Sequence, residues 1–203
     1  FQGEDLSAPG SIAACAKHFA GYGASESGKD YNTTNIPEGE LRNVYLPPFQ
    51  AAVDAGAASI MTSFSDLNGV PATANTLILQ QILRDEWGFD GLVVSDWDSI
   101  HQLSVHGFTA GDRDSAFEAA TAGVDMEMAS QTYAHHLASL VHDGRIAIEH
   151  IDTMVSNILR TKFRLGLFDT PYTDPSLLPD IAAPEHLAAA RHAAVESLVL
   201  LKN

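Results

Sequence analysis

Apolar residues gather in four short runs along the chain, and each run ends on polar or small side chains. The runs are SIAACAKHF (11–19), AASIMTSF (57–64), GLVVSDW (91–97) and AGVDMEM (122–128). Short apolar runs bounded by glycine and polar residues are typical of strands buried on both faces of a parallel sheet. We therefore predict a strand within each run.

The segments between these runs show the spacing of amphipathic helices, with apolar residues three and four positions apart. Pro47 and Pro48 lie inside the first segment, where they mark the first turn of a second helical piece. The third helix is expected to begin at an Asp114-Ser115 cap and to end on Gly123. The predicted helices cover 38–57, 73–89, 114–123, 132–144 and 147–168.

The alternation of strand and helix predicts an α/β fold, either a (β/α) barrel or an open doubly wound sheet. Four strands are too few to close an eight-stranded barrel, so we expect the chain to be part of a larger protein. The alternation stops after Phe168, because residues 169–186 are rich in proline and aspartate and predict a linker. A further helical stretch then runs into an apolar, strand-like segment that reaches Asn203.

Charge and cysteine content narrow the classes of partner. Asp and Glu outnumber Lys and Arg by 26 to 11, which gives a formal net charge of −15. A field of this sign repels nucleic acid and anionic lipid, so we expect neutral or cationic ligands. The sequence has no apolar run of about 18 residues that would predict a membrane span. Cys15 is the single cysteine, so no disulfide can form within the chain.

Chemically useful side chains follow the predicted strands. In parallel α/β proteins, functional groups lie where the strands end at their carboxyl edge. A mouth with carboxylates, a lysine, an imidazole and aromatic walls suits a neutral, polyhydroxylated substrate. For Asp98, a helix cap or a turn residue is a simpler interpretation than a catalytic role. The side chains expected at this mouth are Lys17, His18, Met61, Ser63, Phe64, Asp66, Asp96, Trp97, Asp125 and Glu127.

Other chemistries find little support. His101, His106 and the pair His135-His136 are candidate metal ligands, but the sequence contains no HExxH motif and no Cys/His cluster at ligand spacing. The glycine-containing stretch 21–30 lacks the pattern of a phosphate-binding loop, and no GxSxG motif indicates a serine hydrolase. We therefore expect neither a metal nor a cofactor.

Several stretches together resemble glycoside hydrolase family 3, in particular its bacterial β-glucosidases. The combination of the K-H-F and G-x-x-V-S-D-W motifs carries most of the specificity. The stretches are AKHFAGYG (16–23), SIMTSFSDLNGVPATAN (59–75), LRDEWGFDGLVVSDW (83–97), FEAATAGVDMEM (117–128) and ARHAAVESLVLLKN (190–203).

The resemblance implies a role for each matching residue. Asp96 matches the catalytic nucleophile, which forms a covalent glycosyl-enzyme with retention of configuration. Lys17 and His18 match the pair that holds hydroxyl groups of the sugar in the −1 subsite. Met61 and Phe64 match positions that line this subsite, and Trp97 matches an aromatic residue that flanks the substrate. No cofactor is implied.

The chain departs from the family pattern at two positions. Phe64 stands where a tyrosine that can touch the nucleophile is frequent, and Tyr31 stands where some members carry a sugar-binding carboxylate. The resemblance also implies that the general acid/base comes from a second α/β domain. It assigns residues 1–168 to the C-terminal portion of a (β/α)8 TIM-type barrel, and 169–203 to a linker and helix that lead into the next domain.

The expected function is that of an exo-acting β-glucosidase acting on a β-glucoside or oligosaccharide. A β-xylosidase or exo-glucanase, and a sugar-binding fragment without catalysis, are the alternatives. The β-N-acetylhexosaminidase branch is disfavoured, because residues 20–35 lack the histidine of its acid/base motif. A homodimer and complementing chain segments stay open as partners. A periplasmic or secreted location is favoured by the resemblance, with the cytoplasm as the alternative.

Overall fold

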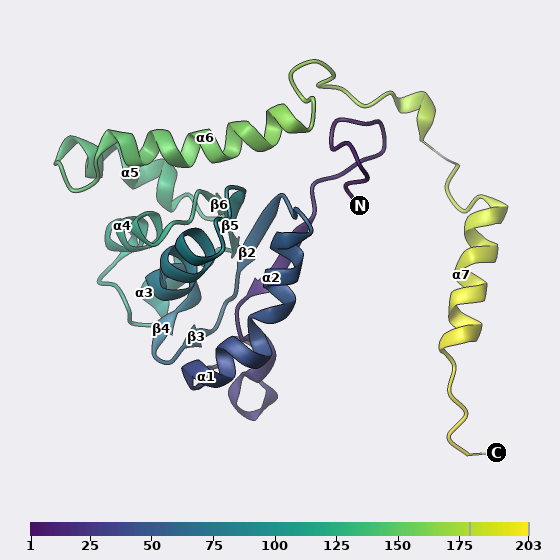
Figure 1. The fold of residues 1–203 in the computed structure, drawn as a ribbon, viewed down its shortest axis with the longest axis horizontal. Helices are drawn as coiled ribbons and strands as arrows, with labels where there is room; N and C mark the ends of the chain where they lie inside the picture. Colours follow the sequence, from purple (N-terminus) through teal and green to yellow (C-terminus); the bar gives the residue numbers. More distant parts are fainter. Residues whose placement is uncertain (179, 203) are drawn as a thin grey trace. The chain divides into compact units, whose positions relative to one another are not determined.

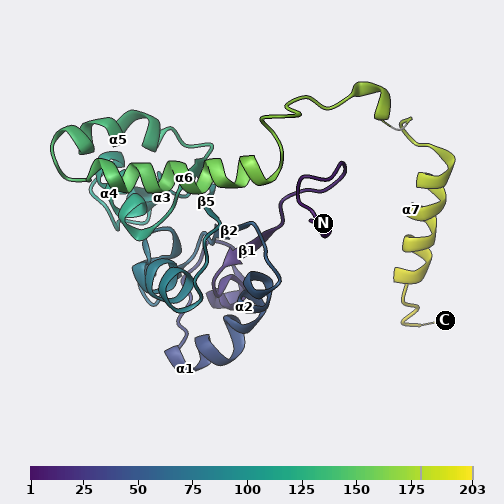
Figure 2. The ribbon, with the colours of Figure 1, turned by 45° about the horizontal axis from the view of Figure 1, so that its top comes forward.

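The computed structural model describes residues 1–178 and 180–202, and internal packing divides the chain into the units Phe1–Asp169 and Thr170–Asn203. The first unit carries a sheet with helices around it (Figures 1 and 2). Its elements are β1 (Cys15–Phe19), η1 (Tyr22–Ala24), η2 (Glu26–Gly28), α1 (Glu38–Glu40), η3 (Leu41–Tyr45), α2 (Pro47–Asp54), β2 (Ser59–Thr62), β3 (Asp66–Leu67), β4 (Val70–Pro71), η4 (Ala72–Ala74), η5 (Leu77–Glu86), β5 (Leu92–Trp97), α3 (Gln102–Val105), α4 (Asp112–Ala122), β6 (Met126–Met128), α5 (Thr132–His142) and α6 (Ile148–Arg164).

The sheet confirms the four predicted strands, which pair in the order β1-β2-β5-β6 with every pair parallel. Sequential parallel strands joined by helices are the arrangement of a (β/α) barrel. Within the described residues β1 and β6 remain the two edges of an open sheet. The chain therefore has an α/β fold whose strand order is that of a barrel segment, and no closed barrel is seen.

Alternating side chains along the strands face two different surroundings. Ile60 and Val93 lie opposite each other in β2 and β5, are fully buried, and belong to the core formed with the helices. Met61 and Val94 are also register partners, but they lie outside that core cluster. Since strand side chains alternate between faces, Asp96 lies on the same face as Val94, away from the helices.

The long predicted helices are present, with local differences. Predicted helix 38–57 is divided into α1, the π-helical η3 and α2, and α2 begins at Pro47 as expected. Helix α4 ends at Gly123 in the left-handed conformation, as predicted. The predicted Asp114-Ser115 cap is wrong, because α4 begins at Asp112 and the Ser115 hydroxyl donates back to the carbonyl of Gly111. Helix α3 and the β3–β4 hairpin were not predicted.

The second unit contains η6 (Pro175–Leu177) and α7 (Pro184–Ser197). The strand-like segment predicted after this helix is wrong for residues 198–202, which form no strand, while Asn203 lies outside the described residues. A strand requires a neighbour for its backbone hydrogen bonds, and the described sheets have no member here. No helix in the described parts of the chain is long and apolar enough to cross a membrane.

The loop between β5 and α4 carries a contact that predicts a pH dependence. His101 Nδ1 lies 2.7 Å from Asp112 Oδ1, and this hydrogen bond to the carboxylate raises the pKa of His101 above its usual value. The charged imidazole therefore stabilises the fold below the unfolded pKa of about 6.5, and the contribution is lost as the pH rises through the higher folded pKa.

We expect His101→Gln to melt at a lower temperature than the parent protein at a pH of about 5.5, and the difference to shrink at higher pH. The effect is below about 1 kcal/mol, because both side chains are 43% exposed. Thermal unfolding of both proteins across this pH range measures it. A difference that is independent of pH would contradict this role of the pair.

Candidate active site at the carboxyl ends of the strands

Asp96 in β5 is the central carboxylate of the site. The residue is 6% exposed, and its Oδ1 accepts a hydrogen bond of 2.7 Å from the backbone N–H of Trp97. The other oxygen, Oδ2, lies 3.2 Å from His18 Nε2, yet it is buried and receives no hydrogen bond from the described residues. Burying an acceptor without a partner costs free energy, so an unsatisfied buried carboxylate oxygen indicates a functional group.

His18 reaches Asp96 from β1, two strands away in the sheet. Burial lowers the pKa of the imidazole, and the charge of Lys17 adds to this effect, while the charges of Asp96 and Asp30 oppose it. The lowered pKa favours a neutral ring at neutral pH. A neutral imidazole has one donor and one acceptor nitrogen, which suits contact with hydroxyl groups. The Lys17 side chain is exposed.

Aromatic rings continue from His18 along the loops after β1 and β2. The Tyr22 ring lies 5.1 Å from the imidazole and 6.2 Å from the Phe64 ring, and Tyr31 lies 4.4 Å from Phe64. Trp97 is 66% exposed, whereas Met61 is buried in β2. Tyr22 was missed at the level of sequence, where its position four residues after His18 was the available signal.

Asp98, only two residues from Asp96, has different surroundings. Its φ of +58° lies in the left-handed region, and its N–H donates to the Met128 carbonyl at 2.8 Å. Its own carbonyl accepts from Gln102 N at 3.1 Å. Asp98 is thus a turn residue, which was one of the two interpretations suggested by the sequence. Its side chain does not cap the helix that follows.

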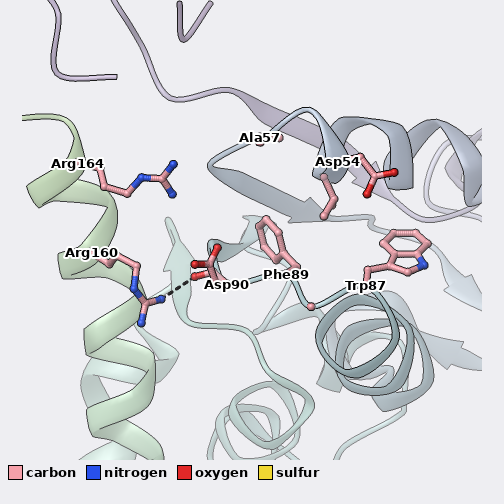
Figure 3. Close-up of a pocket in the computed structure, with 10 residues that line it drawn as sticks. Asp54, Ala57, Trp87, Phe89, Asp90, Arg160 and Arg164 are labelled. Atoms are coloured by element: carbon pink, nitrogen blue, oxygen red, sulfur yellow. Dashed lines mark hydrogen bonds between the residues drawn. The ribbon is translucent and has the colours of Figure 1, made fainter. Parts of the chain in front are cut away.

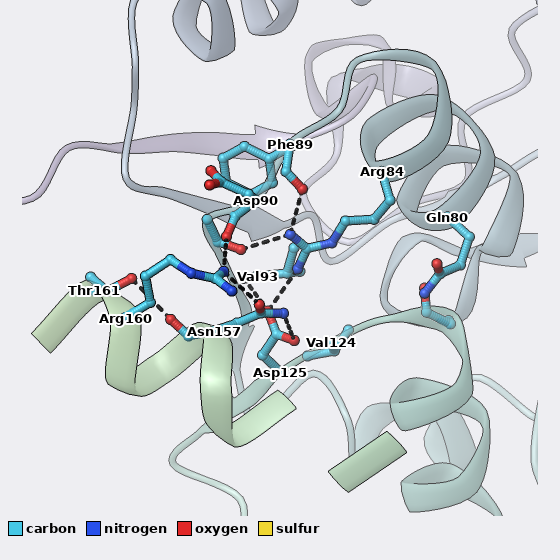
Figure 4. A network of polar contacts seen from close by, with 12 residues as sticks. Gln80, Arg84, Phe89, Asp90, Val93, Val124, Asp125, Asn157, Arg160 and Thr161 are labelled. Carbon is cyan, nitrogen blue, oxygen red and sulfur yellow. Dashed lines mark hydrogen bonds and ion pairs between the residues drawn. The ribbon is translucent and has the colours of Figure 1, made fainter. Parts of the chain in front are cut away.

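Asp125 was expected at the mouth, and this expectation is wrong. It precedes β6 and lies opposite the start of β5, where its Oδ2 accepts from Val93 N and from Arg84 Nη2, each at 2.8 Å (Figure 4). Asn157 of α6 donates to its Oδ1 at 2.9 Å. Burial raises the pKa of Asp125, while Arg84 opposes that shift. The run 122–128 looks continuous in sequence, but its strand begins only at Met126.

The carboxylates of Glu127 and Asp66, which were also expected at the mouth, are both engaged in local hydrogen bonds. Glu127 accepts hydrogen bonds from the backbone N–H groups of Tyr133 and Ala134, at 3.0 and 3.2 Å, near the beginning of α5. Asp66 accepts from the Thr33 hydroxyl at 2.7 Å and from Gly69 N at 3.0 Å. Carboxylates in such positions satisfy backbone donors and shape local structure.

A cavity of about 480 Å³ lies at the opposite ends of the strands, where β2 and β5 begin (Figure 3). Arg160 of α6 donates there to the carbonyl of Asp90 at 2.7 Å. The cavity is far along the strands from Asp96 and contributes nothing to the site. Within residues 1–178 and 180–202, no group of three or more His, Cys, Asp or Glu side chains could hold a metal ion.

Comparison with known proteins places this geometry in a family. The chain is 41% identical over 201 residues to the periplasmic beta-glucosidase of Salmonella typhimurium, covering 95% of this chain and 26% of the relative. It is 36% identical over 211 residues to a beta-xylosidase of Formosa agariphila, covering 99% of this chain and 29% of that protein. The chain thus spans between a quarter and a third of the length of these relatives.

Solved structures agree with the sequence relatives. A beta-glucosidase from Listeria innocua superposes with a TM-score of 0.89 at 41% identity, covering 95% of this chain and 27% of that chain. The same protein has also been solved in complex with glucose. Residues 2–161 match the family described as the glycosyl hydrolase family 3 N terminal domain. The chain belongs to this family, and its sheet is a segment of that family's barrel-like domain.

Proposed function

We propose that this chain carries the nucleophile of an exo-acting, retaining β-glucosidase, and that Asp96 is that nucleophile. The observation that supports it most is the buried Asp96 oxygen, which faces His18 and receives no hydrogen bond. The carboxylate is fixed through its other oxygen by Trp97 N, so it is oriented before substrate arrives. The names of the relatives, a beta-glucosidase and a beta-xylosidase, support the same reaction class.

The proposed reaction has two displacements at the anomeric carbon. An oxygen of Asp96 attacks this carbon, and the bond to the leaving-group oxygen breaks with its electron pair. The leaving oxygen takes a proton from a general acid, which we place outside these 203 residues. Water then attacks the same carbon, gives a proton to the base and releases the Asp96 carboxylate, so the β configuration is retained.

The remaining candidate residues are assigned to substrate binding. His18 and Lys17 hold hydroxyl groups of the −1 sugar, His18 from a position within 3.2 Å of the nucleophile. Phe64 and Met61 line the same subsite, and the exposed Trp97 ring flanks the substrate with its apolar face. Residues 1–168 form the barrel portion in this proposal, and residues 169–203 lead toward the next domain.

Labelling with a 2-deoxy-2-fluoro-β-glucoside tests the proposal. The fluorine slows both displacements, and a good leaving group such as dinitrophenolate keeps the first one fast, so the glycosyl-enzyme accumulates. We expect the full-length protein that carries this chain to lose activity with one label per site, and mass spectrometry to find the label on Asp96. A label on Asp98 or Glu127 would contradict the assignment. A protein that neither hydrolyses aryl glucosides nor takes up the label would contradict the function.

A β-xylosidase is the second candidate, because the Formosa agariphila relative bears that name at 36% identity. Both activities use the same nucleophile and differ in whether the sugar carries a hydroxymethyl group. The ratio of kcat/KM for matched aryl β-glucoside and β-xyloside substrates separates them. A sugar-binding fragment without catalysis is recognised by binding of glucose with no turnover in the full-length protein.

A further inference from the structure

Three buried hydroxyl groups connect the end of β2 with the turn after β5. Thr62 Oγ1, in the last residue of β2, lies 2.9 Å from Thr73 Oγ1 in η4. Thr73 Oγ1 lies 3.0 Å from Ser99 Oγ, which follows β5. The three residues are 0%, 2% and 4% exposed, respectively. Since such buried groups have little access to water, each hydroxyl relies on its neighbour for a hydrogen bond.

Ser99, the last of these three residues, is hydrogen-bonded to the backbone of Asp96, the proposed nucleophile. Ser99 N donates to the Asp96 carbonyl at 3.2 Å, and the Ser95 hydroxyl donates to the same carbonyl at 2.9 Å. On the other side of the turn, Asp98 N donates to the Met128 carbonyl at 2.8 Å. The turn that follows Asp96 at the end of β5 is thus held from β6 and, through Ser99, from β2.

We propose that the hydroxyl chain Thr62–Thr73–Ser99 is a positioning device that keeps the Asp96 carboxylate aimed at the anomeric carbon. This inference rests on the proposed function. The three side chains act through the backbone of Asp96 and have no contact with substrate in this role. An error of about 1 Å in the placement of a reacting group costs about 10²-fold in rate. Holding the turn next to Asp96 in place therefore keeps the rate of attack high.

Thr73 is the critical member, because its hydroxyl is the middle of the chain and bonds on both sides. A hydroxyl group has one donor and two acceptor sites, so it can bond to both neighbours at once. Valine has the shape of threonine but no hydroxyl, and it would leave Thr62 and Ser99 without their partner. Serine keeps the hydroxyl and loses one methyl group. The two substitutions therefore separate hydrogen bonding from packing.

The test compares Thr73→Val with Thr73→Ser in the full-length protein, using inactivation by the 2-fluoro-β-glucoside. We expect Thr73→Val to lower the first-order inactivation rate constant about 10- to 100-fold, with an unchanged inhibition constant, and Thr73→Ser to restore the rate. Ser115→Ala is the matched control, because it removes a fully buried hydroxyl that pairs with Thr109 Oγ1 at 2.7 Å and does not belong to the Thr62–Thr73–Ser99 chain. It should leave the rate constant unchanged.

Hydrogen exchange gives a readout that does not depend on catalysis. In Thr73→Val, the amide of Ser99 should exchange faster than in the parent protein, and in Thr73→Ser it should regain its protection. If the parent protein takes up no label, the proposed function fails, and the exchange of Ser99 still decides whether the hydroxyl chain holds the turn. Parent-like inactivation and exchange in Thr73→Val, or equal losses in the valine and serine variants, would overturn the proposal.

Discussion

Replacement of Asp96 by asparagine is expected to lower turnover of aryl β-glucosides by about 10⁴-fold or more in the full-length protein. The substitution keeps the size of the side chain, and its amide can still accept the 2.7 Å hydrogen bond from Trp97 N. It removes the anion that attacks the anomeric carbon, so the covalent intermediate cannot form. Steady-state kinetics and the absence of the 2-fluoro-glucosyl adduct measure the effect.

Asp98→Asn is the matched control for this substitution. It makes the same chemical change two residues away, in a turn residue that contacts Met128 and Gln102 through its backbone. We expect it to retain most of the turnover. A small loss in Asp96→Asn, or an equal loss in both variants, would show that the nucleophile is another residue.

Replacement of Asp125 by alanine is expected to lower the free energy of unfolding by about 3–5 kcal/mol. Asp125 is 6% exposed and binds Arg84, Val93 N and Asn157, so its removal leaves a guanidinium and two further donors without their partner. A loss of this size is a large part of the stability of a typical domain, which is about 5–15 kcal/mol. Urea-induced unfolding, followed by fluorescence, measures it.

Asp90→Ala serves as the control, because Asp90 is exposed and its carbonyl, rather than its carboxylate, accepts from Arg160. It should change the urea midpoint little. If Asp125→Ala were as stable as this control, the hydrogen bonds of Asp125 with Arg84, Val93 N and Asn157 would make no contribution to stability. A normal rate of labelling per folded molecule in Asp125→Ala would agree with its position away from the site.

Local sequence patterns were sufficient for most of the secondary structure. The apolar runs predicted β1, β2, β5 and β6. Burial on both faces, which such runs indicate, is found for β2 and for most of β5, whereas β1 and β6 each have exposed residues. The spacing of apolar residues predicted α5 and α6 in the same way. Short elements such as α3 and the β3–β4 hairpin have too few residues for a periodic pattern. The cap of α4 was missed, because aspartate and serine are plausible at several positions near a helix start.

Residue roles at the strand ends depended on facts that a sequence does not contain. Asp125 and Glu127 each follow an apolar residue, and Asp96 follows an apolar run and Ser95. Nothing in this local sequence separates a nucleophile from an ion-pair partner or a helix cap. The register between β5 and β6 makes that separation, since it pairs Val94 with Met126 and leaves Asp125 at the entrance of the strand. Register is decided by hydrogen bonds between segments about 30 residues apart. The pattern of a few neighbouring residues therefore does not reveal it.

By itself, the sequence determined the fold class, the order of strands and helices, and the motifs that identify the family. Each of these depends on residues that lie close together in the sequence. Only the tertiary structure decided which polar groups meet. It brings His18 of β1 within 3.2 Å of Asp96 in β5, places Tyr22 and Tyr31 around Phe64, and joins Thr62, Thr73 and Ser99 into one chain of hydroxyls. These contacts link residues far apart in sequence, and they exist because parallel strands bring their carboxyl ends to a single edge of the sheet.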